Sequence, residues 1–180
     1  EEIAKVLKEN YKVIVISRDN YEKHREEYFD IFINANGNSR KYWAEDNPKE
    51  DFKASVTSVY NTLYDFNFGK YIHLSTIDIF DNDKVYGKNK GISEQILIKN
   101  IKDSNLLILR LGAVIGKNMK KGILYDALTT GKLYVTKDSR IQFISTKEIV
   151  GVIKEALKGK FFGLCLDLLS TESIEVGELE

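Results

Sequence analysis

Residues 71–101 read YIHLSTIDIFDNDKVYGKNKGISEQILIKNI and are the most informative stretch of the chain. The first four residues, YIHL, are mostly apolar, which favours a strand buried in a sheet. From Tyr86 onward apolar residues recur at helical spacing, which predicts an amphipathic helix over residues 86–101. Its inward-facing side chains are expected to be Ile92, Ile96, Leu97 and Ile101. The stretch therefore predicts a strand followed by a helix, with two hydroxyl residues, Ser75 and Thr76, directly after the strand.

The same alternation of strand and helix extends to both sides of this stretch. Apolar β-branched runs predict further strands, and periodic apolar residues predict further helices. The expected strands are residues 12–16 (KVIVI), 30–33 (DIFI), 106–111 (LLILRL), 132–135, 140–144 and 161–168. The expected helices are residues 2–10, 48–67, 122–130 and 146–157, the last with Thr146 as its N-cap. This order indicates an α/β fold with a doubly wound parallel sheet.

Tyr86 and Lys90 are the residues that suggest chemistry. They are four positions apart, so one helical face carries both. A free phenol has a pKa of about 10 and is a poor acid or base at neutral pH, but a nearby ammonium lowers that pKa. Such a tyrosine can exchange a proton with a substrate oxygen while hydride passes to or from a nicotinamide. The alternative is an exposed tyrosine and a solvated lysine without a catalytic role.

Five segments, in order along the chain, resemble the extended short-chain dehydrogenase/reductase family in its NAD-dependent epimerase/dehydratase branch. The segments are DIFINANG (30–37), HLSTIDIF (73–80), YGKNKGISEQIL (86–97), LLILRLGAVIG (106–116) and SRIQFISTKEIVGVI (139–153). The resemblance implies a Rossmann-like, NAD(P)-binding domain over residues 1–155. It also implies that residues 156–180 begin a truncated substrate-side lobe.

The resemblance assigns roles to individual residues. Thr76 lies four positions before the aromatic Phe80, so Thr76, Tyr86 and Lys90 are the expected catalytic set. Lys90 is also expected to bind the nicotinamide ribose. Other cofactor-lining residues are expected to be Asn34, Ala35, Gly37 and Gly112, and the substrate-side residues Ser75 and Arg140. For Arg140 a purely structural role is equally open.

The coenzyme is expected to be NADP or NAD. In such sheets an acidic residue after the second strand binds the ribose 2′-hydroxyl, whereas an arginine accepts a 2′-phosphate. Ser17 and Arg18 follow residues 12–16, which slightly favours NADP, although Asp19 could take the ribose instead. The family's glycine-rich turn is absent from the sequence. The expectation is that the first strand is missing from this chain, and a degenerate relative is the alternative.

The implied function is that of an oxidoreductase or isomerase acting on a sugar, expected to be a nucleotide sugar. Dehydratases of the family carry Asp-Glu after the catalytic threonine, whereas Thr76 is followed by Ile77-Asp78, so dehydration is disfavoured and epimerisation or carbonyl reduction remains. The alternative is a non-catalytic NAD(P)-binding sensor or scaffold. The resemblance also implies a homodimer formed through residues 50–67 and 86–101.

Composition narrows the remaining classes. Lys plus Arg and Asp plus Glu number 27 each, and this zero net charge gives no reason to expect nucleic acid or an anionic membrane as partner. No Cys/His cluster has the spacing of a zinc site, so no metal is expected. The single cysteine, Cys165, excludes an internal disulfide and is expected to be buried. A cytoplasmic location is the corresponding expectation.

Overall fold

The structure, a computed structural model, describes residues 2–81, 83–117, 119, 122–130 and 135–179. Its contacts divide the chain into two units. The larger unit comprises Ile14–Arg110 and Gly159–Leu166, and the smaller one comprises Glu1–Val13, Leu111–Lys158 and Asp167–Glu180. Both units are discontinuous in sequence.

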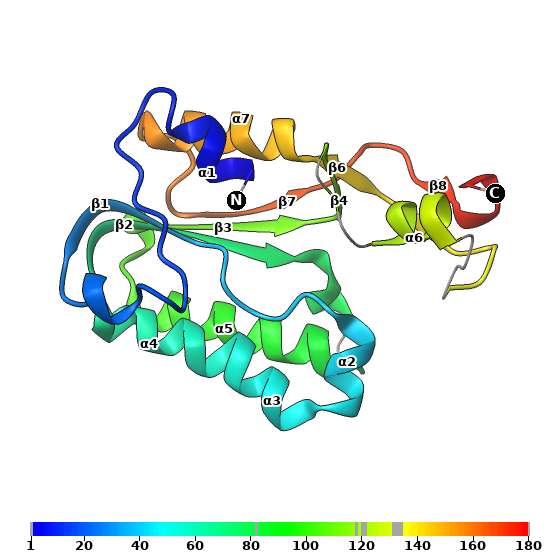
Figure 1. The fold of residues 1–180 in the computed structure, drawn as a ribbon, viewed down its shortest axis with the longest axis horizontal. Helices are drawn as coiled ribbons and strands as arrows, with labels where there is room; N and C mark the ends of the chain where they lie inside the picture. Colours follow the sequence, from blue (N-terminus) through cyan, green and yellow to red (C-terminus); the bar gives the residue numbers. More distant parts are fainter. Residues whose placement is uncertain (1, 82, 118, 120–121, 131–134, 180) are drawn as a thin grey trace. The chain divides into compact units, whose positions relative to one another are not determined.

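A four-stranded parallel sheet is the main feature of the fold (Figure 1). Its strands lie in the order β1-β2-β3-β7. Their bounds are Tyr28–Asn34 for β1, Asn67–Thr76 for β2, Leu106–Leu111 for β3 and Leu164–Leu168 for β7. In β1 and β2, Asn34 lies opposite His73. The expected α/β class with a parallel sheet is confirmed.

Helices of the larger unit cover one face of this sheet (Figure 1). The helix expected over residues 48–67 is formed by α3 (Pro48–Phe52), a π-helical turn η2 (Lys53–Thr57) and α4 (Ser58–Asp65). The next long helix, α5, spans Val85–Asn100. Shorter helices are η1 (Glu22–His24), α2 (Lys41–Asp46), η3 (Ile77–Phe80) and η4 (Asp103–Asn105). The core between sheet and helices contains Val59, Tyr71, Leu97, Ile101, Leu106 and Ile108.

The smaller unit contains three helices and two short strand pairs among its described residues. The helices are α1 (Glu2–Leu7), α6 (Ile123–Thr130) and α7 (Thr146–Leu157), followed by the short η5 (Val176–Leu179). Strand β4 (Ala113–Ile115) pairs in parallel with β6 (Phe143–Ser145), and β5 (Arg140–Ile141) pairs antiparallel with β8 (Ile174–Glu175). Helix α7 has the expected bounds, but its N-cap is Ser145 rather than Thr146.

The strand expected over residues 12–16 does not form. The described structure contains no strand pairing for this run, and a strand needs a neighbour for its backbone N–H and C=O groups. Ile14 and Val15 are 41% and 43% exposed, contrary to the expected burial. Asn20 closes a turn after the run, because its side-chain amide donates to the Val15 carbonyl at 3.0 Å.

Two predictions of burial, for Ile92 and Cys165, are wrong, and one predicted strand lies mostly outside the described residues. Ile92 of α5 is 37% exposed instead of facing inward. Cys165 is exposed, because it lies on β7, the last strand in the order of the sheet. The expected strand over residues 132–135 falls outside the described residues except for Val135.

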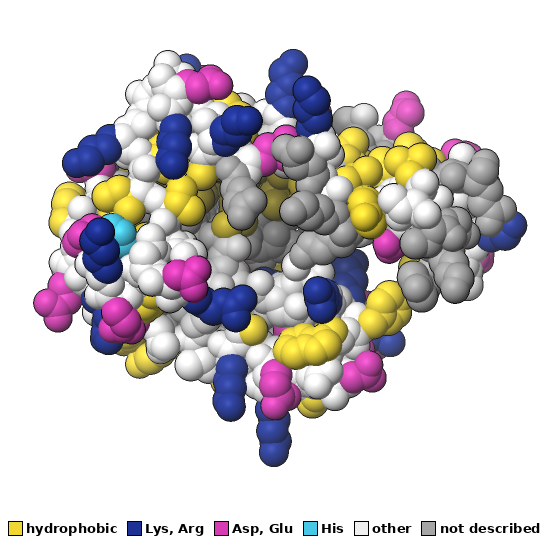
Figure 2. Space-filling view, viewed as in Figure 1, with side chains coloured by type: hydrophobic (Ala, Val, Ile, Leu, Met, Phe, Trp, Pro, Cys, Tyr) yellow, Lys and Arg dark blue, Asp and Glu magenta, His cyan; other side chains and the backbone are white. Residues whose placement is uncertain are grey.

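Positive and negative side chains are interspersed on the face of the molecule seen in Figure 2. Within the described residues, no helix is both long enough and apolar enough to span a bilayer. The same residues contain no group of three or more His, Cys, Asp or Glu side chains arranged to hold a metal ion.

Candidate active site

Three segments meet near the carboxyl ends of β1 and β2. Strand β1 ends at Asn34 and leads into a loop that contains Gly37, and β2 ends at Thr76. Helix α5 supplies Tyr86 and Lys90 one turn apart near its start. Ligands of parallel α/β sheets bind at this edge, so these residues are placed where a site is expected.

Gly87 allows the start of α5 to approach the segment that follows Thr76. A Cβ atom at Gly87 would lie 2.1 Å from the Asp78 carbonyl oxygen and 2.7 Å from that of Asp81. Both atoms belong to the backbone and cannot move aside cheaply. The glycine therefore permits the close contact between η3 and α5 that brings Tyr86 toward the end of β2.

Lys90 lies between the loop of residues 35–40, hereafter the Gly37 loop, and the ring of Tyr86. Its Nζ atom is 5.7 Å from the ring centroid of Tyr86, and both residues are buried. A Cβ atom at Gly37 would come within 2.5 Å of the same Nζ atom. Gly37 also has a φ of +121°, a conformation that favours glycine. The structure thus brings together three of the predicted site residues.

The pKa of the Tyr86 phenol is raised, not lowered as the sequence predicted. Burial is the main cause, and the negative charges of Asp78 and Asp51 raise the pKa further. Lys90 lies over the face of the ring, within reach of a cation–π contact. The phenol is therefore protonated at neutral pH in this structure.

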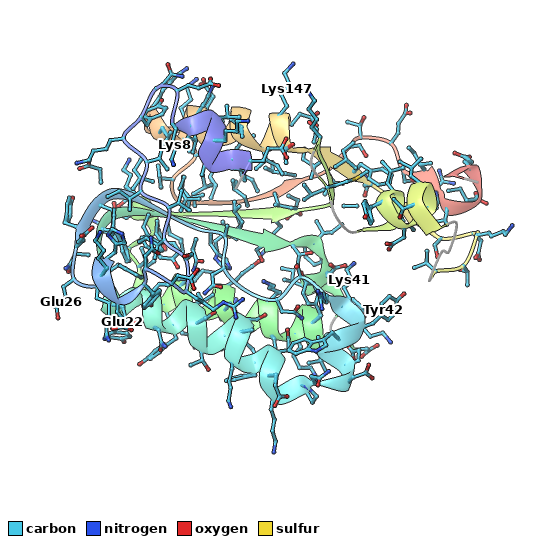
Figure 3. All side chains as sticks on the ribbon, in the orientation of Figure 1. Lys8, Glu22, Glu26, Lys41, Tyr42 and Lys147 are labelled. Carbon is cyan, nitrogen blue, oxygen red and sulfur yellow. The ribbon has the colours of Figure 1, made fainter. Side chains whose placement is uncertain are left out.

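Thr76 bonds to an acid that the sequence argument discounted. Its Oγ1 donates to Asp78 Oδ2 at 2.8 Å, and the Asp78 backbone N–H donates back to Oγ1 at 3.2 Å. Lys41, labelled at the start of α2 in Figure 3, forms an ion pair with Asp78 Oδ1 at 2.5 Å. A carboxylate therefore contacts the Thr76 hydroxyl, although it lies two positions from Thr76 in sequence and not directly after it.

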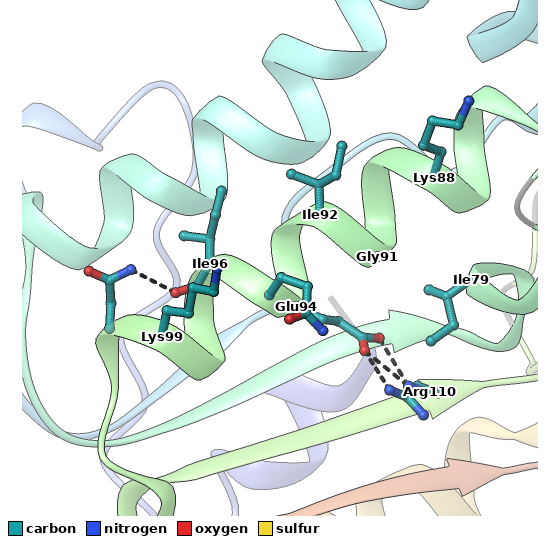
Figure 4. Close-up of a pocket in the computed structure, with 10 residues that line it drawn as sticks. Ile79, Lys88, Gly91, Ile92, Glu94, Ile96, Lys99 and Arg110 are labelled. Carbon is teal, nitrogen blue, oxygen red and sulfur yellow. Dashed lines mark hydrogen bonds and ion pairs between the residues drawn. The ribbon is translucent and has the colours of Figure 1, made fainter.

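Ser75 does not share a site with Thr76, because successive side chains of a strand point to opposite faces. The Ser75 hydroxyl donates to Glu94 Oε1 of α5 at 2.5 Å, inside the protein. Arg110 of β3 holds Glu94 Oε2 at 2.7 Å (Figure 4). Glu94 and Arg110 line a groove of about 630 Å³ along α5. Ser75 is therefore part of a buried polar network, and its expected contact with substrate is corrected.

Asn34 ends β1 and Ala35 begins the loop after it, and the two residues differ in exposure. Asn34 is buried; its Nδ2 donates to the Tyr71 hydroxyl at 2.6 Å, and its Oδ1 accepts from the Asn36 backbone N–H at 2.8 Å. Its side chain therefore shapes the loop after β1. Ala35 is exposed, which leaves this part of the loop accessible to a ligand.

Gly112 and Arg140 belong to the smaller unit. The Gly112 N–H donates to the Leu168 carbonyl at 2.9 Å, and a Cβ atom at Gly112 would lie 2.7 Å from the Gln142 carbonyl oxygen. Close backbone approach explains this glycine. The Arg140 guanidinium bonds to the Ser173 hydroxyl at 2.8 Å and lies 3.6 Å from Glu175. Arg140 thus contacts residues of β8 and the position before it.

The structure does not bring Ser17 and Arg18 to the other site residues. Both are exposed in a turn, where the Ser17 N–H donates to the Asn20 side chain at 2.6 Å. Tyr21, directly after this turn, donates to Asp65 at the end of α4. Because residues 12–16 do not enter the sheet, the residues that follow are not carried to its carboxyl edge.

Sequence reasoning missed Asp51, Asn38 and Asn89, which form a buried polar cluster beside the site. Asp51 accepts hydrogen bonds from both asparagines. Asp51 carries no signal in the sequence, because an acidic residue in the first turn of a helix is common. Its partners are distant in sequence, so the sequence did not identify them.

The fold is that of a Rossmann-like α/β domain, in which Thr76 ends β2 and Tyr86 and Lys90 lie near the start of α5. No sequence model of a protein family matches the chain, and no curated protein does. Solved structures do match. The chain resembles a UDP-galactose 4-epimerase with a TM-score of 0.77 and 14% identity, covering 98% of this chain and 75% of that one.

A reductase and a second protein, both solved with coenzyme, share the fold as well. For dTDP-4-dehydrorhamnose reductase from Bacillus anthracis, solved with NADP, the TM-score is 0.68 at 13% identity, covering 99% of this chain and 65% of that one. For RMD from Pseudomonas aeruginosa, solved with NADPH, the TM-score is 0.66 at 16% identity, covering 83% and 63%. The chain therefore spans less than two thirds of either of these two proteins, and at these identities the likeness shows the fold.

Proposed function

We propose that this chain carries the catalytic side of an NAD(P)-dependent epimerase or reductase that acts on a sugar or nucleotide sugar. The observation that carries the proposal is the position of the Lys90 ammonium, which contacts the Gly37 loop and lies over the Tyr86 ring. The names of the solved structures with this fold, together with their NADP and NADPH ligands, support the same class of reaction.

The described residues fit the nicotinamide and ribose part of such a coenzyme. Lys90 offers a buried ammonium to ribose hydroxyls, and the exposed backbone at Ala35 and the glycine at position 37 allow a ligand to approach. The sequence contains no Gly-x-Gly-x-x-Gly turn for a pyrophosphate. We propose NAD or NADP as coenzyme. We propose no preference between the two, because Ser17 and Arg18 are not brought to the other site residues.

The proposed chemistry divides between the coenzyme and three side chains. The bound nicotinamide supplies or accepts hydride. Thr76 positions the substrate oxygen, and Tyr86 exchanges a proton with that oxygen. Because its pKa is raised, Tyr86 begins as a proton donor, which suits protonation of a carbonyl oxygen as it is reduced. Lys90 stabilises the phenolate that remains.

A second candidate function is a non-catalytic NAD(P)-binding sensor or scaffold. One substitution separates the two functions. Tyr86→Phe removes the proton donor but keeps the ring that Lys90 contacts. We expect it to lower turnover of a nucleotide sugar by at least about 100-fold while coenzyme affinity changes little. Fluorescence titration with NADPH and NADH measures affinity. During incubation with UDP- and dTDP-linked sugars, coenzyme absorbance measures reduction, and chromatography of the sugar products measures epimerisation, which leaves the coenzyme unchanged overall.

Tyr60→Phe, which removes the hydroxyl of an exposed tyrosine of α4, is the matched control and should leave both quantities unchanged. If the chain binds coenzyme but Tyr86→Phe turns over as fast as wild type, Tyr86 is not the proton donor. If coenzyme binds and no sugar is turned over, the sensor function is favoured.

Two further expectations are part of this proposal. A homodimer through α4 and α5 is proposed from the family resemblance, and exposed apolar side chains on both helices support it. A cytoplasmic location is proposed from the single cysteine.

A further inference from the structure

Asp51 is a buried carboxylate whose hydrogen bonds join three segments of the larger unit. It lies in α3 with no exposed surface. Its Oδ1 accepts from Asn38 Nδ2 at 2.8 Å and from Ser55 Oγ at 3.3 Å. Its Oδ2 accepts from Asn89 Nδ2 at 2.7 Å. A buried carboxylate is costly unless it is hydrogen-bonded, so these donors stabilise it in place.

The two asparagines adjoin the two sides of the Lys90–Gly37 contact. Asn38 directly follows Gly37 and belongs to the Gly37 loop. Asn89 directly precedes Lys90 on α5. Within the loop, Asn38 Oδ1 also accepts from the Arg40 N–H at 2.9 Å. The hydrogen bond from Asn38 to Asp51 therefore restrains the loop backbone as well as the Asn38 side chain. The Asp51 carboxylate therefore links the loop and the helix whose residues meet at the site.

A second bond between the same helices fixes their register. The π-helical turn η2 follows Asp51 and contains Ser55, whose carbonyl accepts from Ser93 Oγ at 2.7 Å. Asp51 and Ser55 are four residues apart, as are their partners Asn89 and Ser93. One turn of each helix thus carries two polar contacts in the same register. Wider turns of this type are frequent at functional sites.

We propose that Asp51 is a positioning residue, which holds the Gly37 loop and α5 at the separation that places Lys90 for coenzyme. The proposal rests on the function proposed above. Its physical basis is pre-organisation: a loop that is ordered before a ligand binds does not lose conformational entropy on binding.

The test compares local amide hydrogen exchange in the full chain without coenzyme. Asp51→Leu removes both acceptor oxygens and leaves the side-chain amides of Asn38 and Asn89 without this partner. We expect exchange to accelerate by about tenfold or more in residues 36–40 and 86–93, with the sheet core unchanged. Asp51→Asn keeps an acceptor for Asn38, and the Asn89 amide can turn over to accept from it. This conservative variant should restore most of the protection.

Asp46→Leu, the same substitution at an exposed position of α2, is the matched control and should leave both segments protected. Unchanged exchange in Asp51→Leu would overturn the proposal. So would an acceleration that is uniform over the chain, because that result assigns Asp51 to global stability alone. If Asp51→Leu does not fold, Asn38→Ala carries the test, since it should release residues 36–40 while residues 86–93 stay protected.

Fluorescence titration with NADPH separates this proposal from the proposed function. If wild type binds NADPH, Asp51→Leu should raise the dissociation constant by about tenfold and Asp46→Leu should not. An unchanged constant in Asp51→Leu would overturn the positioning role. If wild type binds neither NADPH nor NADH while the local exchange effect is present, Asp51 still positions the loop, and the proposed function is the part that fails.

Discussion

His73 shows how one residue of the sheet ties stability to pH. It is fully buried in β2, and neither ring nitrogen has a hydrogen-bond partner among the described residues. Burial lowers the pKa of its imidazole from 6.5 to about 3, and the charge of Lys90 contributes to the shift. Between those two values the unfolded chain binds a proton that the folded chain does not. The free energy of unfolding therefore decreases as pH falls from 6.5 toward 3.

Replacing His73 with Phe should remove this dependence. Between pH 7 and pH 5 we expect the free energy of unfolding of wild type to fall by about 2 kcal/mol because of His73. This decrease should be absent from the variant. Urea unfolding at the two pH values measures it. His24→Phe is the matched control, because that histidine lies outside the sheet beside Glu27. Equal pH dependence of wild type and His73→Phe would show that His73 does not stay neutral on folding.

At this scale the sequence predicted the residues whose placement depends on local geometry. Tyr86 and Lys90 share a helical face because of their spacing, and Thr76 lies at a strand end. The role of Ser75 was wrong because strand alternation sends it to the opposite face from Thr76. The direction of the Tyr86 pKa was wrong because burial raises it, and the charges of Asp78 and Asp51 raise it further. Burial depends on long-range packing, which spacing does not reveal.

At the scale of elements, α7 is held at its start by a reciprocal pair of hydrogen bonds. The Ser145 hydroxyl accepts from the Glu148 N–H, and the Glu148 carboxylate accepts from the Ser145 N–H at 2.9 Å. Ser145→Ala should lower the free energy of unfolding by about 1 kcal/mol, because it leaves a backbone donor at the helix start without a partner. Thermal or urea unfolding measures the loss.

Ser104→Ala, at an exposed position of η4, is the control and should change the free energy of unfolding by less than about 0.5 kcal/mol. A similar loss in both variants would contradict the capping role of Ser145.

Elements were predictable where the local pattern and the tertiary contacts agree. Residues 106–111 form the expected strand because LLILRL is apolar enough to be central in the sheet. Residues 12–16 (KVIVI) are richer in β-branched residues but stay unpaired, since strand formation requires a partner that no local pattern specifies. Helix α2 was missed because its six residues are too few to show a periodicity.

The chain divides into two units that do not follow the order of the sequence. Each unit is assembled from separate stretches of sequence, and β7 begins in one unit and ends in the other. A single boundary placed along the sequence does not describe such units. The parallel sheet was predictable, however, because alternating strands and helices leave few other arrangements.

The proposed dimer makes a prediction about the surface of the larger unit. Tyr64 and Tyr60 of α4 are 64% and 44% exposed, and their ring centroids lie 4.9 Å apart. Ile92 and Ile98 of α5 are each 37% exposed, and Ile92 lines the groove shown in Figure 4. Exposed apolar side chains on neighbouring helices are typical of a protein interface.

We expect light scattering after gel filtration to give twice the chain mass for wild type. Tyr64→Lys should yield a monomer, because a lysine ammonium desolvated in an apolar interface has no compensating partner. Tyr28→Lys is the matched control, since Tyr28 is equally exposed, at 65%, but lies at the start of β1. A dimer that survives Tyr64→Lys would place the interface elsewhere. A monomeric wild type would mean that the exposed side chains of α4 and α5 do not suffice to hold two chains together.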